Sequence, residues 1–310
     1  MAGDRSGLTA ILISGPTASG KSAVALELAE RFGGDVINAD SMQVYRELKL
    51  LTARPEPADM AGIPHHLYGT VEVAESYSVG HWLADAAAAL KAAQEMRRLP
   101  ILVGGTGLYF KALLEGLSPL PDIPPETREL WRERSERLDA EGLFAELKAR
   151  DPVMAERLMP SDKQRVVRAL EVIAATGITL AEWQATPGTP TLETDDVLKL
   201  VVAPERELLY RAIDARFDRM IDEGAIDEVR ALVDLRLRPG LPAMRALGVR
   251  ELAACLAGMV TLEEAATKAK TESRRYAKRQ MSWTRRFMAD WEWFADGSSA
   301  VEAASAHNTT

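Results

Sequence analysis

The stretch that most constrains the fold is GPTASGKS, residues 15–22, which follows a short apolar run and precedes a helical pattern. It fits the pattern G-x-x-x-x-G-K-[ST] in the strand–loop–helix context that this pattern requires. Its glycines let the backbone curl so that N–H groups converge on phosphate oxygens, while the helix N-terminus adds positive charge. We therefore predict a diphosphate or triphosphate site formed by Gly15, Pro16, Thr17, Ala18, Ser19, Gly20, Lys21 and Ser22, in which the Ser22 hydroxyl binds Mg²⁺.

Apolar runs typical of strands alternate with helical patterns along much of the chain. The runs at 8–14, 35–39, 100–105 and 197–202 are rich in Val, Ile and Leu, and helical spacing covers 22–32 and 79–98. A further helix is expected from near Thr106. This alternation predicts an α/β fold with a doubly wound, mostly parallel sheet that binds its ligand beyond the carboxyl ends of the strands.

The pattern changes after Gly116, where a proline-rich hinge is followed by helical patterns alone. The strand at 197–202 then returns the chain to the sheet. We predict a core of residues 1–118 and 195–290, including the C-terminal helices, with an all-helical insertion domain at 119–194. The small, polar tail 296–310 has the composition of a disordered segment.

Charge and composition limit the kinds of binding partner and the compartment that we expect for this chain. The formal net charge of -8 and pI near 5.3 argue against RNA binding, which depends on neutralising phosphates. Residues 268–286, however, contain eight Lys or Arg side chains against Glu272 alone, and such a local stripe is compatible with RNA. No apolar run approaches the about 20 residues of a membrane helix. The single cysteine, Cys255, excludes a disulfide framework and favours the reducing cytoplasm.

Two features separate this chain from ordinary ATPases. The strand at 100–105 leads into Gly-Gly-Thr-Gly (104–107), without the carboxylate that usually supports Mg²⁺ in ATPases. The loop at 15–22 recognises a diphosphate unit, and ATP is only one of the molecules that carry one. Asp40 ends the strand 35–39 and is expected beside the phosphate loop. Taken alone, Asp40 is as compatible with a supporting role, for Mg²⁺ or as a helix cap, as with a direct role in the chemistry.

Further motifs accompany Asp40: Ser41 and Gln43, IPHHL (63–67), GGTGLYF (104–110), QRVVRALEV (164–172) and RRYAKRQMSW (274–283). With the phosphate loop, and in this order along nearly the whole chain, they resemble the tRNA dimethylallyltransferases, also called tRNA isopentenyltransferases. The resemblance implies transfer of a dimethylallyl group from dimethylallyl diphosphate to N6 of the adenosine immediately 3′ of the anticodon in tRNA. It also implies that the phosphate loop holds the leaving diphosphate, with Mg²⁺ as cofactor.

The resemblance also assigns catalytic roles. Asp40 becomes the base that orients the adenine amino group and accepts its proton. Arg216 in the segment ARFDRM stabilises the diphosphate, with Arg219 as the alternative. Thr106 lies near the bridging oxygen of the donor, although its position also suits the N-cap of the next helix.

The family's tRNA contacts map onto two groups of residues. Asp40, Ser41, Met42, Gln43 and Thr106 would line the pocket for an extruded base, and Gln43 could recognise the adenine edge. The second group is Arg128, Gln164, Arg165, Val166, Val167 and Arg168. Arg165 and Arg168 share one helix face, which suits consecutive phosphates. Alternatively, they pair with Asp162 or Glu171 on their own helix.

The chain departs from the family pattern at three places. Arg54 stands where a lysine is usual, Tyr68-Gly69 stands where Ile-Asp is usual, and Val249 replaces a tyrosine. His65-His66 is expected to be a structural or RNA-facing pair rather than a zinc site, because no second ligand cluster accompanies it. Trp291 and Trp293 are expected in the core.

Two other functions are compatible with parts of the sequence. A phosphate-loop kinase acting on a small molecule would use the Arg-rich insertion as a lid and would turn over ATP, but it leaves DSMQ and RRYAKRQMSW unexplained. A non-catalytic RNA-binding protein would not need intact Lys21, Ser22, Asp40 and Thr106. We therefore expect a monomeric, cytoplasmic tRNA-modifying enzyme with no membrane association.

Overall fold

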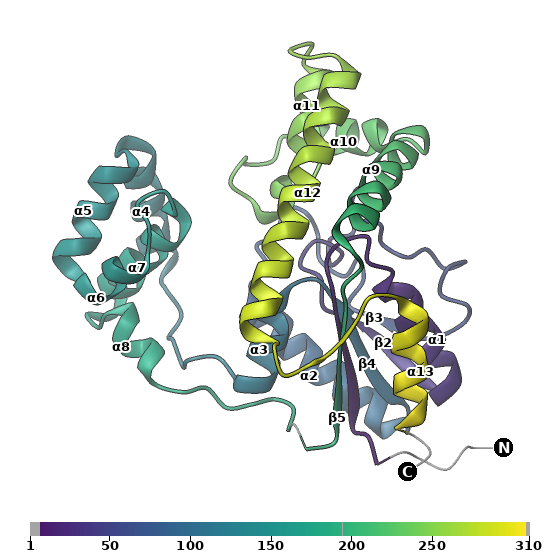
Figure 1. Ribbon diagram of the computed structural model, residues 1–310. Helices are drawn as coiled ribbons and strands as arrows, with labels where there is room; N and C mark the ends of the chain where they lie inside the picture. Colours follow the sequence, from purple (N-terminus) through teal and green to yellow (C-terminus); the bar gives the residue numbers. More distant parts are fainter. Residues whose placement is uncertain (1–6, 194, 308–310) are drawn as a thin grey trace. The chain divides into compact units, whose positions relative to one another are not determined.

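The computed structural model describes residues 7–193 and 195–307, and these contain one sheet of six strands in the order β3-β2-β4-β1-β5-β6 (Figure 1). All neighbouring strands are parallel. The strands are β1 (Ala10–Ser14), β2 (Gly34–Asn38), β3 (His65–His66), β4 (Leu99–Gly104), β5 (Val197–Val202) and β6 (Glu292–Phe294). This confirms the predicted fold class. β3 and β6 were not predicted, because runs of two and three residues carry no periodic signal.

Helices cover both faces of the sheet. The helices α1 (Lys21–Phe32) and α13 (Gly297–Ala306) pack on the face that carries Ile11 and Ile13. The helices α2 (Val79–Glu95) and α3 (Gly107–Glu115) pack on the opposite face, where Leu12 contacts the cluster of Trp82 and Phe110. Because β1 is buried on both faces, its sequence is a continuous apolar run rather than an alternating one.

The end of the chain differs from the prediction. The tail 296–310 was expected to be disordered, but Gly297–Ala306 forms helix α13. Asp296 caps it by accepting a hydrogen bond from the Ser299 amide at 2.8 Å, and Ala300, Val301 and Ala304 are buried against the sheet. The composition misled because small residues can pack a helix closely onto a sheet. Residues 308–310 lie outside the described residues.

A second group of helices continues from β5. It comprises α9 (Arg206–Asp222), α10 (Ala225–Asp234), the 3₁₀ helix η1 (Pro242–Arg245), α11 (Val249–Leu256) and α12 (Leu262–Phe287). Helices α9 and α12 lie side by side (Figure 1), joined by the ion pairs Arg274–Asp214 at 2.6 Å and Lys270–Asp218 at 2.5 Å. Part of the basic stripe at 268–286 is therefore used to pack α12 on α9.

The chain divides into two compact units. The sheet unit comprises the residues up to Leu114 and from Thr191 onward, and the helical unit comprises Glu115–Pro190. The helical unit contains α4 (Pro125–Arg137), α5 (Ala140–Arg150), α6 (Pro152–Arg157), α7 (Lys163–Thr176) and α8 (Leu180–Ala185) around its own core, which includes Trp131, Leu147 and Leu170. Independent domains with boundaries at 118/119 and 194/195 stay a prediction, because compactness alone does not show independent folding. No helix in the described ranges combines the length and apolarity needed to cross a bilayer.

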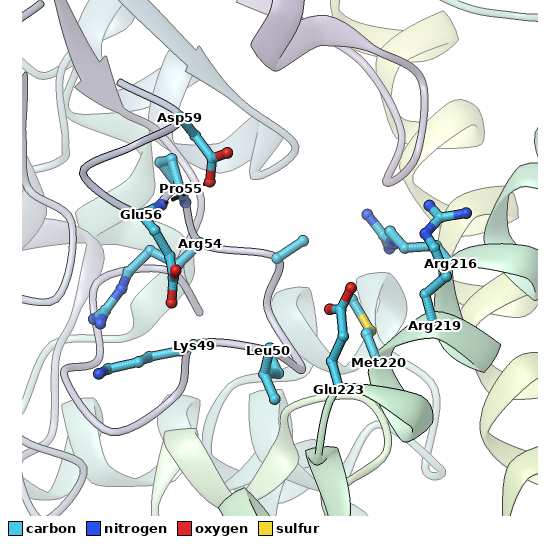
Figure 2. Close-up of a pocket in the computed structure, with 11 residues that line it drawn as sticks. Lys49, Leu50, Arg54, Pro55, Glu56, Asp59, Arg216, Arg219, Met220 and Glu223 are labelled. Atoms are coloured by element: carbon cyan, nitrogen blue, oxygen red, sulfur yellow. Dashed lines mark hydrogen bonds between the residues drawn. The ribbon is translucent and has the colours of Figure 1, made fainter. Parts of the chain in front are cut away.

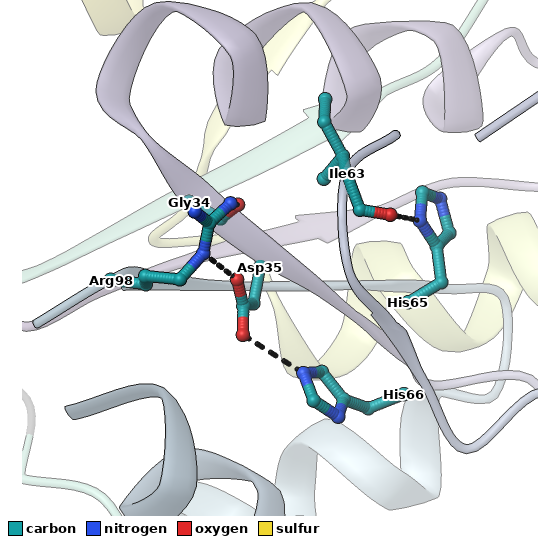
Figure 3. Close-up of polar contacts among 6 residues, drawn as sticks. All are labelled: Gly34, Asp35, Ile63, His65, His66 and Arg98. Atoms are coloured by element: carbon teal, nitrogen blue, oxygen red, sulfur yellow. Dashed lines mark hydrogen bonds and ion pairs between the residues drawn. The ribbon is translucent and has the colours of Figure 1, made fainter. Parts of the chain in front are cut away.

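The side chain of His66 ties the edge strand β3 to β2, whereas that of His65 contacts the segment just before β3 (Figure 3). His66 Nε2 lies 2.9 Å from the Asp35 carboxylate, which also receives a hydrogen bond from Arg98. His65 Nδ1 lies 2.9 Å from the carbonyl oxygen of Ile63, and burial lowers its pKa. Within residues 7–193 and 195–307, no three His, Cys, Asp or Glu side chains are grouped as metal ligands. The pair is structural, as expected.

Candidate functional site

Three loops leave the same edge of the sheet, at the carboxyl ends of β1, β2 and β4. Ser14 at the end of β1 is paired with Gly104, and Asn38 at the end of β2 is paired with Val103. The phosphate loop (residues 15–22), the Asp40 turn (residues 40–43) and the GGTG loop (residues 104–107) therefore begin side by side. This is the edge at which parallel α/β sheets bind ligands.

The phosphate loop has the curled backbone that the sequence predicted. Ala18 and Gly20 both have positive φ angles, 63° and 86°, which turn successive N–H groups inward. Lys21 Nζ donates to the carbonyl oxygen of Pro16 at 3.1 Å, and Ser22 follows in the first turn of α1. The hydroxyl of Ser19 is buried and has no hydrogen-bond partner within the described residues. A ligand oxygen would satisfy it.

These residues fit a magnesium–diphosphate ligand. Mg²⁺ is usually held by one or two protein oxygens, with phosphate oxygens and waters completing its shell. Ser22 is exposed at the start of α1 and can supply one such oxygen. The unpartnered Ser19 hydroxyl and the inward N–H groups suit the phosphate oxygens.

Helix α12 clamps the phosphate loop to the GGTG loop through Gln280. The Thr17 amide donates to Gln280 Oε1 at 2.9 Å, and Gln280 Nε2 donates to the carbonyl oxygen of Gly105 at 2.9 Å. A Cβ at position 105 would lie 2.2 Å from Gln280 Nε2, and one at Gly107 would lie 2.1 Å from the Trp283 ring. These glycines are thus required by the close approach of α12. This role of Gln280 was not predicted, although RRYAKRQMSW contains the residue.

Helix α9 brings Arg216 to the phosphate loop, where its guanidinium donates to the Thr17 hydroxyl. Burial lowers the pKa of Arg216, the charge of Asp40 raises it, and Arg219 lowers it further. Of the two arginines that the sequence offered, Arg216 makes the contact with the loop. Arg219 lies one turn away and faces a cavity.

Lys21 is strongly desolvated in the loop. Burial lowers its pKa to about 8, with Asp40 raising it and Arg216 lowering it. The cluster therefore contains two cations and one carboxylate close enough to influence one another. Two desolvated cations with spare hydrogen bonds form a site for a multiply charged anion.

A network of backbone hydrogen bonds fixes Asp40. Its amide donates to Asn38 Oδ1 at 2.8 Å, and its Oδ1 accepts from the Met42 amide at 2.9 Å. Asn38 Nδ2 donates to the carbonyl oxygens of Asp40 and Leu67, both at 3.0 Å. No hydrogen bond to Oδ2 is found within residues 7–193 and 195–307. Asp40 is held in place with one oxygen ready to accept a proton.

Three tyrosines that the sequence analysis did not assign surround this carboxylate. Burial raises the pKa of Tyr68, Tyr109 and Tyr276, and the negative charge of Asp40 raises each further. Tyr109 stacks on Trp82 with ring centroids 4.2 Å apart. The tyrosines belong to three separate segments, so only the fold brings them together. Tyr68 and Tyr276 are partly exposed and provide aromatic surface near Asp40, whereas Tyr109 is buried in the core.

The Thr106 hydroxyl joins the GGTG loop to the Asp40 turn. It accepts from the Ser41 amide at 3.0 Å and lies 3.3 Å from the Ser41 hydroxyl, to which it can donate. Thr106 also directly precedes α3, and its carbonyl oxygen accepts from the Tyr109 amide at 2.9 Å, so the N-cap position and the contact with the Asp40 turn are compatible. Thr106 stands between the two loops, next to Asp40.

A cavity of about 570 Å³ opens between residues 49–59 and helix α9 (Figure 2). Its lining carries both signs of charge, from Lys49, Arg54, Arg216, Arg219, Glu56, Asp59 and Glu223. The mixed charge contrasts with the cationic phosphate loop, and only Arg216 belongs to both places. In Figure 2, Arg54 extends away from Arg216 and Arg219, so the three arginines are not directed at one anion.

The remaining predicted site residues lie in the helical unit. Arg165 and Arg168 do pair within α7, each at 3.5 Å, with Asp162 and Glu171. Their side chains nevertheless remain 71% and 40% exposed. Arg128 of α4 is exposed, and its charge opposes the burial-driven rise in the pKa of Glu171, as does Arg168. Arg128 and Arg168 therefore belong to one cationic surface, with Gln164 exposed beside them.

The position of Val166 differs from the predicted set of tRNA contacts. It was expected to touch tRNA with its neighbours, but its side chain has no exposed surface and belongs to the core of the helical unit. The reason is helical periodicity, which turns Arg165 and Val166 to different sides of α7. Val167 is half-buried against the same core.

The chain is similar to known proteins over most of its length. Residues 43–287 match the family model "IPP transferase", and residues 8–70 match the model "Isopentenyl transferase". A tRNA dimethylallyltransferase of Nitrobacter hamburgensis is 53% identical over 284 residues, covering 92% of this chain and 90% of the relative.

Solved structures show the same likeness. The tRNA isopentenylpyrophosphate transferase of Bacillus halodurans is similar with a TM-score of 0.68 and 36% identity, covering 96% of this chain and 94% of that one. A eukaryotic dimethylallyltransferase acting on tRNA gives a TM-score of 0.79 at 29% identity, covering 93% of this chain and 73% of that one. The chain therefore belongs to the IPP transferase family, whose curated relatives are tRNA dimethylallyltransferases.

Proposed function

We propose that this protein transfers a dimethylallyl group from dimethylallyl diphosphate to N6 of the adenosine immediately 3′ of the anticodon in tRNA. The products are N6-(dimethylallyl)adenosine and diphosphate. The observation that carries the proposal is the placement of Asp40 beside a phosphate loop that already holds Lys21 and Arg216. A proton acceptor for the nucleophile thus adjoins a cationic site for the leaving group.

The phosphate loop binds the donor by its diphosphate. The inward N–H groups, Lys21 and Arg216 neutralise the charge that grows on the leaving oxygen. Ser22 is the residue that would hold Mg²⁺, which supplies further positive charge to the diphosphate when bound. Binding and orientation of the donor by these residues require no hydrolysis of a nucleotide.

Asp40 serves the acceptor. The adenine amino group is a weak nucleophile because its lone pair is delocalised into the ring, so a carboxylate that orients it and takes its proton assists the attack. The N6–C bond forms as the allylic C–O bond breaks. The proton moves to Asp40 and the electron pair leaves on the diphosphate. The Thr106 hydroxyl contacts the Asp40 turn, and with the donor bound it would give its one hydrogen to the bridging oxygen instead of to the Ser41 hydroxyl.

Two of the tyrosine side chains near Asp40 suit an extruded base and an allylic chain. Tyr68 and Tyr276 are partly exposed, and base–aromatic stacking is worth about 1–3 kcal/mol per base. Tyr109 is buried against Trp82 and supports the site from the core. We further propose that Arg128, Gln164, Arg165 and Arg168 contact tRNA phosphates from the exposed surface of the helical unit.

Transfer of label tests this function directly. Purified protein with Mg²⁺, unmodified tRNA and labelled dimethylallyl diphosphate should place label in RNA, and Asp40→Ala should abolish it. Replacing the adenosine 3′ of the anticodon by guanosine should also abolish it, since the amino group at C6 is then absent. Label-free RNA, together with ATP consumption on small-molecule acceptors, would instead support a phosphate-loop kinase.

A further inference from the structure

The carboxamide of Gln43 has a fixed orientation. Gln43 Nε2 donates to two carbonyl oxygens, those of Thr52 at 2.9 Å and Ala53 at 3.0 Å. Both hydrogens of the amide nitrogen are thereby used, and an oxygen in that place would face two other oxygens. No hydrogen bond to Gln43 Oε1 is found within the described residues. Gln43 can therefore offer a ligand only an acceptor.

The segment that orients Gln43, the 48–54 turn, is held at two points. The Glu228 carboxylate of α10 accepts from the amides of Lys49 and Leu50, both at 2.8 Å, and from Leu51 at 3.1 Å. Arg54 Nη1 donates to the carbonyl oxygen of Tyr45 at 2.9 Å. Glu228 thus fixes the start of the turn, and Arg54 ties its end to the chain just after Gln43.

The guanidinium of Arg54 occupies the space that a side chain at position 69 would need. A Cβ at Gly69 would lie 2.0 Å from Arg54 Nη1 and 2.7 Å from Arg54 Cζ. Gly69 also has a φ angle of +63°, and its amide donates to the carbonyl oxygen of Gln43 at 2.9 Å. A side chain at position 69 and the observed guanidinium of Arg54 therefore exclude each other.

We propose that Arg54 and Gly69 form a coupled positioning pair that holds the Gln43 carboxamide as a hydrogen-bond acceptor for an exocyclic amino group of the RNA base. This rests on the proposed function. In guanine a keto oxygen stands at the place of this amino group. It would face the Gln43 oxygen as a second acceptor, and no hydrogen bond could form. Arg54 acts through the 48–54 turn and touches no substrate itself.

The pair can be tested with Gly69→Ala against a matched control, Gly62→Ala. Both glycines have positive φ angles, 63° and 75°, but nothing lies within 4 Å of a Cβ at Gly62. Both substitutions therefore carry the same backbone strain, and only Gly69→Ala displaces Arg54. We expect Gly69→Ala to raise the KM for tRNA about tenfold with the Kd of dimethylallyl diphosphate unchanged. Gly62→Ala should leave both at the wild-type value.

The double variant separates coupling from independent damage. Arg54→Ala should raise the KM for tRNA by a similar factor, and Arg54→Ala with Gly69→Ala should be no worse than Arg54→Ala alone. The proposed coupling would be wrong if the increases in the KM for tRNA multiply in the double variant. It would also be wrong if Gly62→Ala raises this KM as much as Gly69→Ala does. The same cycle is measured on unfolding by denaturant, which needs no tRNA. A different result would be coupling in unfolding while the wild type transfers no label to tRNA. That result would refute the proposed function and the assignment of an RNA amino group as the ligand of Gln43, but it would leave the contact of Arg54 with Gly69 intact.

Discussion

The phosphate loop and the Asp40 turn leave neighbouring parts of one sheet edge, yet they are built differently. The phosphate loop is shaped by its own backbone, with positive φ angles at Ala18 and Gly20 and a helix N-terminus behind it. The Asp40 turn is shaped by side chains, since Asn38, Thr106 and Gln43 bind backbone groups from three separate segments, residues 40–41, 52–53 and 67. A local motif is sufficient for the first, whereas the second exists only in the folded chain.

The difference follows from what each loop has to recognise. A diphosphate is a compact, highly charged group that convergent N–H groups can bind whatever molecule carries it. An adenine amino group is neutral and must be met by an acceptor in one orientation, which requires side chains that are themselves held in place. Under the proposed function, general binding of the leaving group and specific binding of the nucleophile are divided between adjacent loops.

Asp40→Asn gives the sharpest separation of the two loops. Asparagine keeps an oxygen for the Met42 amide but cannot take a proton, so we expect kcat to fall about 10³-fold. The Kd of dimethylallyl diphosphate should stay within about threefold, because the phosphate loop is unchanged. Single-turnover label transfer and equilibrium binding measure the two values. Equal losses in both would show that Asp40 serves the donor as well.

Arg216→Gln should act on the other side of the comparison. Removing a desolvated cation from the phosphate loop should lower kcat by about 10²-fold and weaken diphosphate binding. Arg219→Gln is the matched control on the same helix, one turn away, and we expect it to retain kcat within about threefold. If the two variants show the same loss, the charge of α9 matters rather than the contact with Thr17.

The sequence predicted most of the fold, for a clear reason. Signals within about ten residues, such as the phosphate loop, its flanking strand and helix, and the apolar runs of β4 and β5, were all found in place. The short strands β3 and β6 and the helix α13 were missed, because they are stabilised by the sheet rather than by their own periodicity.

In the site, residues were missed when their role depends on distant segments. Gln280 bonds to Thr17 and Gly105, which are separated from it by more than 170 positions. The tyrosines near Asp40 come from three segments, and the contact of Arg54 with Gly69 joins two positions that looked like unrelated departures from a family pattern. No local sequence pattern predicts contacts between residues that are so far apart in the chain. Conversely, Val166 was included because motif membership was taken as contact.

Lys21 makes the phosphate loop sensitive to pH. Its pKa is lowered to about 8 in the ligand-free protein, so it is charged below that pH and becomes neutral above it. A bound diphosphate favours the charged form. We therefore expect the affinity for dimethylallyl diphosphate to be level from pH 7 to 8 and to fall up to about tenfold per pH unit above 8.

Binding measured between pH 6.5 and 9.5 checks this, with Lys21→Met as the control. That variant should bind weakly throughout and show no break near pH 8, because the titrating group is gone. A break that persists in Lys21→Met would assign the titration to another group.

The smallest effects should come from the helical unit, where recognition uses exposed charges instead of a desolvated site. Arg165→Ala and Arg168→Ala should each weaken tRNA binding about three- to tenfold and leave kcat at saturating tRNA unchanged, because phosphate contacts position the RNA without touching the reacting atoms. Each should also lower the slope of log Kd against log salt by about one if it contacts a phosphate.

Arg137→Ala provides the comparison, since Arg137 of α4 is 80% exposed and pairs with Glu133 in the same manner. It should change neither the affinity nor the salt slope. A slope that stays constant in Arg165→Ala and Arg168→Ala would mean that these arginines serve only their ion pairs with Asp162 and Glu171. Specificity would then rest on the Asp40 turn alone, and the helical unit would need another role. A changed slope would instead show that these exposed, paired arginines contact RNA phosphates and hold the strand.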